Sequence, residues 1–422
     1  MLDRTVAPLS GKIEQVEIKQ AETVLLDNGV PLHIIKAGSQ PIIRIELLIN
    51  GGNWFEPGTG VSFLTTKMLS EGTKHRSAAD INKIIENYGA NLELTPGLDQ
   101  IEVTLTCLTR YFQNLLPLLR EMIFEAVFPE QELQTIKNIK IQTIRVDNQK
   151  NNIVASKQLR KKLFGTIHPY GRILTESDVE GVERKTLVNY HSNTVLNNYE
   201  IVVSGDFKDE YIKVFNQNFG QNQLQRKKPS TFYPVTPDDQ KTYVHKDDAL
   251  QSAIRLGKIT LKKQHKDYID LLIANEILGG YFGSRLMTNI REEKGYTYGI
   301  YSHIYPLHND SFFLISTEAV SQYTKPAVDE IYKELKRLRS EPVGTDELES
   351  VKSYMIGAFL NSIDTPFNLA DKFKSINLFG LDYDYFDRYL KKIHEITPER
   401  IMEVTNTYLH EDGISEVIIG KL

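Results

Sequence analysis

The chain has 422 residues, of which 41% are hydrophobic and 25% are charged, a composition ordinary for a globular protein with more than one domain. Its formal charge of −5 provides no general attraction to a polyanion, so nucleic acid is not an expected partner. No stretch approaches the roughly 20 apolar residues that span a bilayer, and a membrane is not an expected partner either.

The first fifteen residues, MLDRTVAPLSGKIEQ, lack the apolar run of a secretory signal, so we expect a cytoplasmic protein. A chain trimmed of its signal would look the same, which leaves export as the alternative. Cys107 is the only cysteine, and it alternates with apolar residues over 101–107. This pattern predicts a buried thiol on a strand and excludes an internal disulfide.

In the first half, alternating apolar residues over 43–49 predict a strand, followed by a short helix over 61–70. Ser77 and Asp80 form a capping-box pattern that opens a second helix, which ends at Gly89. Strands at 91–95 and 101–108 and mostly helical sequence over 110–165 follow. This mixed order favours an antiparallel sheet with helices on one face over a doubly wound parallel sheet.

The helix over 61–70 has Phe63, Thr66 and Lys67 at the spacing of an H-x-x-E-H motif. In that motif two His side chains bind zinc and the Glu is the general base. Phe63 has no lone pair for a metal, Thr66 cannot take up a proton near neutral pH, and Lys67 would place a cation beside a dication. The scattered His residues form no other ligand cluster, so we predict no metal on this chain.

Residues 137–162 carry a strongly basic run with Asp147 as its only acidic residue. A solvated helix face is the default interpretation of such a run, and a docking surface for an acidic partner or for the acidic ends of substrates is the alternative. The basic residues are Lys137, Lys140, Arg145, Lys150, Lys157, Arg160, Lys161 and Lys162.

A polar, proline-containing segment over 221–241 predicts a linker between an N-terminal domain at 1–220 and a C-terminal domain at 242–422. Both domains close in the same way, because a helix over 184–196 precedes YEIVVSG and a helix over 398–409 precedes SEVIIG. Gly205 and Gly420 are then equivalent positions, which indicates duplication of one α+β unit.

In the second half we expect a strand near 253–260, an apolar buried helix over 267–278, and amphipathic helices at 326–339, 345–360 and 366–379. Between them, a helix over 284–294 precedes a strand on which Tyr296, Tyr298 and Ile300 should share one face. A tight turn would bring Arg291 and Tyr298 to the same rim, where their donors suit a peptide carbonyl or a developing oxyanion. Alternatively, Arg291 complements the negative end of its helix and Tyr298 packs with its hydroxyl in water.

Together these motifs resemble the insulinase-type (pitrilysin) zinc peptidases from about Thr23 to Leu422. The frame Met68-Leu69, then Gly72-Thr73, matches the sequence that follows the family's zinc motif, and HPYG at 168–171 also matches. The resemblance implies an α+β fold of two tandem homologous domains, each an antiparallel sheet with helices packed on one face. It places the third zinc ligand, a Glu, near Gln142 or Thr143, yet no acidic residue lies between Leu133 and Val146.

The resemblance also assigns the family's substrate-binding Arg/Tyr pair to Arg291 and Tyr298. In the family this pair lies across the cleft from the zinc helix, where it holds the substrate backbone and helps stabilise the tetrahedral intermediate. The family's peptide-binding strand would fall near Ala90 to Thr95, where the match is partial.

A chain that has lost the zinc motif but keeps the Arg/Tyr pair resembles the non-catalytic subunits of heteromeric family members such as the mitochondrial processing peptidase. The resemblance therefore implies a subunit that clamps a peptide substrate for a zinc-bearing paralogue, with zinc on the partner and no cofactor on this chain. A catalytically silent structural protein, like the core subunits of a respiratory complex, is the alternative. The isolated chain could form a homodimer, and a lone active metallopeptidase would need ligands that this sequence does not have.

Overall fold

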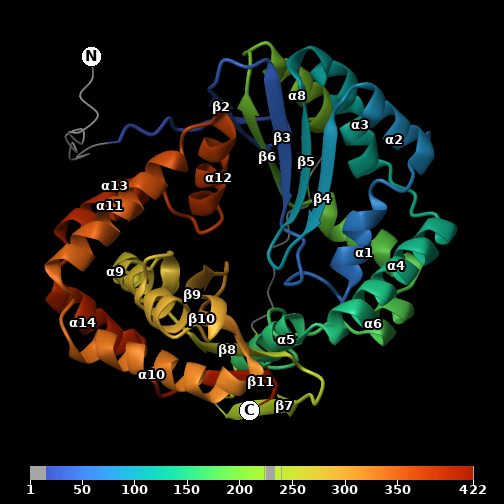
Figure 1. Ribbon diagram of the computed structural model, residues 1–422. Coiled ribbons are helices and arrows are strands. Elements are labelled where there is room, and N and C mark those ends of the chain that lie inside the picture. The colour runs from blue at the N-terminus through green and yellow to red at the C-terminus, as the bar shows by residue number, and fades with distance from the viewer. Residues whose placement is uncertain (1–15, 223, 225–232, 239, 422) are drawn as a thin grey trace, which may run out of the picture.

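Figure 1 shows a computed structural model of the chain, which describes residues 16–222, 224, 233–238 and 240–421. Two β-sheets, each with its own helices, make up the molecule, as the α+β prediction requires. In the described residues, no helix combines the length and the apolar character needed to cross a membrane.

The first sheet has the strand order β1-β2-β6-β3-β5-β4, in which β2 and β6 are parallel and all other neighbours are antiparallel. Its strands are β1 (Glu22–Leu25), β2 (Pro31–Lys36), β3 (Ile42–Ile49), β4 (Asn91–Pro96), β5 (Ile101–Leu108) and β6 (Tyr199–Gly205). The accompanying helices are α1 (Val61–Met68), α2 (Ala78–Asn87), α3 (Phe112–Phe124), α4 (Glu130–Gln149), α5 (Asn151–Phe164), α6 (Glu176–Gly181), α7 (Arg184–Tyr190) and α8 (Tyr211–Phe219), with short turns η1 (Thr109–Tyr111) and η2 (His191–Val195).

The second sheet has the order β7-β11-β8-β10-β9, with β7 and β11 parallel and the other pairs antiparallel. Its strands are β7 (Lys241–His245), β8 (Gln251–Ile259), β9 (Thr297–Pro306), β10 (Ser311–Val320) and β11 (Ser415–Gly420). The helices are α9 (Tyr268–Asn275), α10 (Thr324–Ser340), α11 (Thr345–Asn361), α12 (Pro366–Asn377), α13 (Asp384–Glu395) and α14 (Pro398–Tyr408), with η3 (Glu276–Gly280), η4 (Met287–Glu293) and η5 (Ser321–Tyr323).

The two halves repeat one topology, as the duplication hypothesis requires. The strand order β2-β6-β3-β5-β4 corresponds to β7-β11-β8-β10-β9, and each sheet contains one parallel pair at the corresponding place. Gly205 ends β6 opposite Lys36, and Gly420 ends β11 opposite His245, at φ 112° and 144°. At these φ values an L side chain is strained, so both copies use glycine where the closing strand leaves the sheet.

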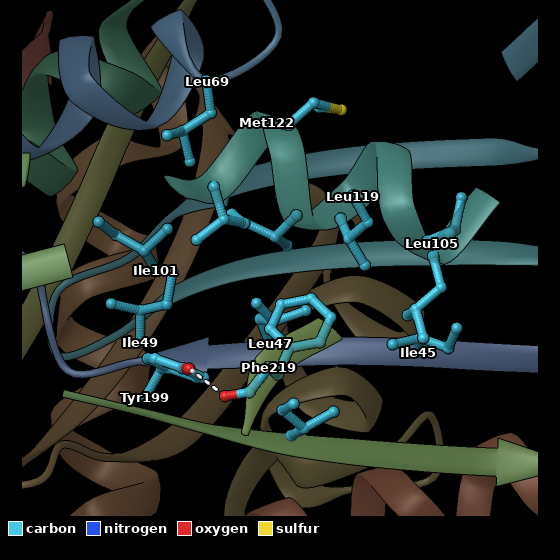
Figure 2. Packing of buried hydrophobic residues seen from close by; sticks show 14 of the residues in the cluster. Ile45, Leu47, Ile49, Leu69, Ile101, Leu105, Leu119, Met122, Tyr199 and Phe219 are labelled. Atoms are coloured by element: carbon cyan, nitrogen blue, oxygen red, sulfur yellow. Dashed lines mark hydrogen bonds between the residues drawn. The ribbon is translucent and has the colours of Figure 1, made fainter. Parts of the chain in front are cut away.

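The core of the first half lies between its sheet and the helices α1, α2, α3, α7 and α8 (Figure 2). Leu119 and Met122 of α3 face the apolar side of the sheet, and the Tyr199 hydroxyl donates to the Phe219 carbonyl oxygen at 3.3 Å. Cys107 is buried in this core, and burial raises the pKa of its thiol to about 11. The predicted buried thiol is therefore confirmed.

The opposite face of each sheet is covered by a helix from the other half. Leu159 and Leu163 of α5 pack with Val417 and Ile419 of the second sheet. In turn, α12 lies beside β2 and β6 of the first sheet, where its apolar residues pack on Ile35, Leu48 and Val202 (Figure 1). This exchange joins the halves through two apolar contacts that neither half could make alone.

An ionic cluster accompanies the contact of α12 with the first sheet. The Lys374 ammonium lies 2.6 Å from Oε1 of Glu46, and Arg44 lies 2.9 Å from Asp371. Glu46 is only 1% exposed, and burial raises the pKa of its carboxyl group although Lys374 and Arg44 oppose that shift. The cluster therefore compensates a carboxylate that is expensive to bury.

The linker predicted over 221–241 falls partly on residues 223, 225–232 and 239, which lie outside the described part of the chain. The domain boundaries at 220 and 242 therefore stay a prediction. The two sheets share no strand. Every strand of the first sheet ends at or before Gly205, and every strand of the second begins at or after Lys241.

Candidate functional site

Helix α1 places the residues of the degenerate motif beside one another with no metal ligand among them. Thr66 is buried, and its hydroxyl donates to the Ser62 carbonyl oxygen one turn earlier, at 2.8 Å. Lys67 turns its ammonium away from the helix and donates to the Leu94 carbonyl oxygen at 2.6 Å. Phe63 is half-buried, with the Lys140 ammonium 4.2 Å from the centre of its ring.

A cavity of about 610 Å³ opens at this point between α1, α2, β4 and α4. Phe63, Lys67 and Lys140 line it, and so does Thr143, one of the two positions, with Gln142, near which the resemblance places the third ligand. None of these four side chains supplies an imidazole, thiolate or carboxylate. Glu71 and Glu86 also line the cavity, but two carboxylates without a His or Cys beside them do not make up the ligand set of a zinc site. In the ranges that the structure describes, no group of three or more His, Cys, Asp or Glu could hold a metal ion.

The strand expected to bind peptide, Ala90 to Thr95, corresponds to β4, which is an edge strand of the first sheet. An edge strand offers unpaired backbone groups to an added strand. Here the Lys67 ammonium already donates a hydrogen bond to the carbonyl oxygen of Leu94, which is one of the backbone groups of that strand. Lys67 thus replaces a metal ligand with a cation that is anchored to the sheet.

Glu56 is a feature of this region that sequence reasoning missed. It is 5% exposed, and Oε2 accepts hydrogen bonds from the backbone N–H groups of Gly60 and Ser62, at 3.1 and 3.0 Å. Burial raises the pKa of Glu56 to about 7, although these hydrogen bonds and the charge of Arg172 act in the opposite direction. An acidic residue shortly before a helix is too common in sequences to have identified this buried carboxyl group.

Arg291 and Tyr298 lie together on the second half, as their spacing predicts. Arg291 is in the last turn of η4, and its guanidinium lies 5.5 Å from the centre of the Tyr298 ring and 4.5 Å from that of Phe282. Tyr298 is 88% exposed. Arg291 is half-buried, and no described residue forms a hydrogen bond or an ion pair with its guanidinium or with the Tyr298 hydroxyl.

The expectation that Tyr296, Tyr298 and Ile300 share one face is wrong. Ile300 pairs with Thr317, whereas Thr297 pairs with Ala319, so Tyr298 and Gly299 together lie opposite one residue of β10. This β-bulge reverses the alternation, which leaves Ile300 fully buried and Tyr298 outside. The bulge therefore presents Tyr298 to solvent beside Arg291.

The structure does not bring the two sets of site residues into one cavity of this chain. The residues lining the cavity at α1 belong to the first half alone, and Arg291 and Tyr298 lie outside it. Their assignment as substrate-binding residues stays a prediction.

Two protein-family models match most of the chain. Residues 34–176 match the model described as "Insulinase (Peptidase family M16)", and residues 182–355 match "Peptidase M16 inactive domain". The first match contains β3, β4, β5 and the degenerate helix α1, and the second contains β6 and also η4 and β9 with Arg291 and Tyr298.

Similar proteins carry both active and inactive designations. The chain is 24% identical to "Uncharacterized zinc protease YmxG" of Bacillus subtilis, over 91% of this chain and 95% of that protein. It is 21% identical to "Non-peptidase homolog YmxG" of Helicobacter pylori, over 90% and 89%. A match to mitochondrial-processing peptidase subunit beta of Mus musculus has 20% identity over 70% of this chain and 62% of that one.

Among solved structures, the peptidase M16 inactive domain from Pseudomonas fluorescens superimposes with a TM-score of 0.86. The superposition covers 95% of this chain and 98% of that chain, with 22% sequence identity. This likeness confirms the predicted fold of tandem α+β units.

Proposed function

We propose that this chain, which belongs to the insulinase family of peptidases (family M16), is a subunit that holds peptide substrate for a zinc-bearing paralogue. One contrast supports the proposal: α1 carries no zinc ligand, whereas the half-buried Arg291 and the exposed Tyr298 lie side by side, with no hydrogen-bond partner for their donors among the described residues.

The proposed role of the pair is to bind the substrate backbone at the partner's active site. A guanidinium presents several N–H donors in a fixed plane, and the phenol adds one more. Stacking of the Arg291 guanidinium with Phe282 and Tyr298 restricts its motion, so less entropy is lost when it binds a carbonyl oxygen or a developing oxyanion. The chemistry itself belongs to the partner, because α1 has no group that activates water.

The proposed partner is a paralogue with an intact H-x-x-E-H motif. A relative named as a subunit of mitochondrial-processing peptidase supports this arrangement by analogy. The alternative, a catalytically silent structural protein, is favoured by the hydrogen bond between Lys67 and Leu94, which occupies part of the edge that a peptide would use.

Co-expression tests the partnership directly. A tagged form of this chain is produced together with the H-x-x-E-H paralogue of the same genome, and the purified material is analysed for the second chain, for zinc and for peptide hydrolysis. We expect a stable complex whose zinc content matches the paralogue alone and whose hydrolysis depends on both chains. Full hydrolysis by the paralogue without this chain would refute the proposal.

A further inference from the structure

The structure divides the basic run over 137–162 into two groups. The outer group is neutralised: Arg145 lies 2.7 Å from Glu176, Lys150 lies 3.4 Å from Asp147, and Lys162 lies 2.7 Å from Asp238. Lys137 is buried and donates to a backbone carbonyl oxygen. These residues behave as the solvated or structural face that is the default interpretation of such a run.

The inner group consists of Lys140, Lys157 and Arg160, which line a second cavity of about 290 Å³ between α4, α5 and the loop before α1. No carboxylate of the described residues forms an ion pair with any of the three. Lys140 lies over the Phe63 ring, and Lys157 donates to Oδ1 of Asn148 at 3.3 Å.

Two carboxyl groups also line this cavity, but both are engaged elsewhere. Glu56 accepts two backbone N–H groups and lies 3.8 Å from Arg172, and Asp147 is paired with Lys150. Burial lowers the pKa of Arg160. Burial also lowers the pKa of Lys140, and the charges of Lys157 and Lys67 add to this effect against Asp147. Half-buried cations without counterions are costly, and an incoming anion would remove that cost.

The two cavities adjoin, because both are lined by Phe63 and Lys140. The larger cavity borders the edge strand β4 and is lined by Lys67 and by two carboxylates, Glu71 and Glu86, so the excess of positive charge lies in the smaller cavity. A peptide lying along this region would therefore pass the degenerate motif of α1 and would meet the ammonium and guanidinium groups beside it.

We propose that the smaller cavity binds a carboxylate of a peptide that lies along the larger one, with Arg160, Lys140 and Lys157 as its partners. The carboxylate comes either from an acidic side chain or from the peptide's C-terminus. Arg160 of α5 supplies a planar guanidinium that matches carboxylate geometry. Lys157 adds a positive charge from the same helix, and Lys140 adds one from α4. The inference rests on the proposed function, since it names the class of peptide that the subunit selects.

The test uses the full chain without partner and fluorescein-labelled octapeptides in an anisotropy titration. One peptide pair differs by a central Glu or Gln, and a second pair differs by a free or an amidated C-terminus. We expect the carboxylate member of at least one pair to bind about tenfold more tightly than its neutral counterpart. The pair that shows the preference identifies the source of the carboxylate.

Arg160→Gln should remove that preference, and Lys161→Gln is the matched control. Lys161 is the next residue on α5, is exposed and does not line the cavity, so the two variants lose the same charge at different places. Equal binding of both members of both pairs, or a preference that survives Arg160→Gln, would overturn the inference.

These outcomes separate the inference from the proposed function. If the chain prefers the carboxylate peptide but the paralogue hydrolyses peptides fully without it, the anion site is supported and the subunit role is refuted. If hydrolysis depends on this chain but no carboxylate preference is found, the subunit role is supported and the anion site is refuted.

Discussion

The guanidinium of Arg291 lies 5.5 Å from the centre of the Tyr298 ring, although the two residues come from different elements, η4 and β9. The turn at Gly295, with φ 66°, and the bulge at Tyr298 and Gly299 create this proximity. Because of the bulge, the phenol of Tyr298 points to solvent, whereas in a regular strand it would lie on the same buried face as Ile300.

Tyr298→Phe should lower kcat/KM of the reconstituted complex by about tenfold, because it removes one donor and keeps the ring that stacks on Arg291. Tyr298→Ala should cost more, since it also removes the stacking partner. Steady-state hydrolysis of one peptide by both variants measures the difference. Equal rates for wild type and both variants would mean that Tyr298 contributes nothing to the reaction.

Glu56 makes stability depend on pH. Its carboxyl pKa rises from the ordinary value of 4.5 to about 7 in the folded chain, so the folded state holds the proton more tightly than the unfolded state. The stabilising contribution of the protonated Glu56 is fully present below pH 4.5 and is lost as the pH rises through 7. Above that pH the free energy of unfolding no longer depends on this group. Over this window the free energy of unfolding should fall by up to about 3 kcal/mol more in wild type than in Glu56→Gln.

Urea unfolding followed by fluorescence of Trp54, the only tryptophan, measures this difference at each pH. Glu86→Gln, at an exposed position on α2, is the control and should keep the wild-type profile. Parallel profiles for wild type and Glu56→Gln would show that the buried carboxyl group does not titrate in this window.

Lys374→Met should destabilise the chain by about 3 kcal/mol, because it leaves the buried Glu46 carboxylate without its nearest cation. The double variant Glu46→Gln with Lys374→Met should recover most of this loss, since it removes the uncompensated charge. Lys391→Met, at an exposed position on α13, should change stability by less than about 0.5 kcal/mol. Chemical denaturation at pH 7 compares the variants, and a harmless Lys374→Met would show that Arg44 alone compensates Glu46.

Chelation should not affect the isolated chain. Because Phe63, Thr66 and Lys67 offer no zinc ligand, we expect EDTA to leave its Tm unchanged within about 1 °C, whereas a bound metal would stabilise the folded state. Metal analysis by mass spectrometry after gel filtration provides the second readout. Stoichiometric zinc, or a clear fall of Tm in EDTA, would contradict the prediction.

Local patterns in the sequence were sufficient to predict much of the fold. The capping box of Ser77 and Asp80 occurs as expected and opens α2, and the equivalence of Gly205 and Gly420 follows from two similar helix–strand endings. The buried α9 also follows from its apolar composition. These features depend on residues that are close in sequence, where propensity and periodicity act.

Contacts between distant segments could not be predicted in this way. The exchange of α5 and α12 between the two sheets joins apolar residues that are distant in sequence, such as Leu159 with Val417, and no local pattern indicates which sheet a helix covers. The bulge at Tyr298 breaks the period of two on which the strand prediction relied. Likewise, the sequence shows a basic run, but only the fold separates Arg160 and Lys140 from the paired residues around them.

The most direct test of the central claim is kcat/KM for peptide hydrolysis by the zinc-bearing paralogue, measured with wild-type chain, with Arg291→Ala and without this chain. We predict that Arg291→Ala lowers the value at least about 100-fold and that omission of the chain abolishes hydrolysis, whereas the surface control Arg337→Ala on α10 has no effect. Undiminished hydrolysis with Arg291→Ala, or by the paralogue alone, would contradict the account.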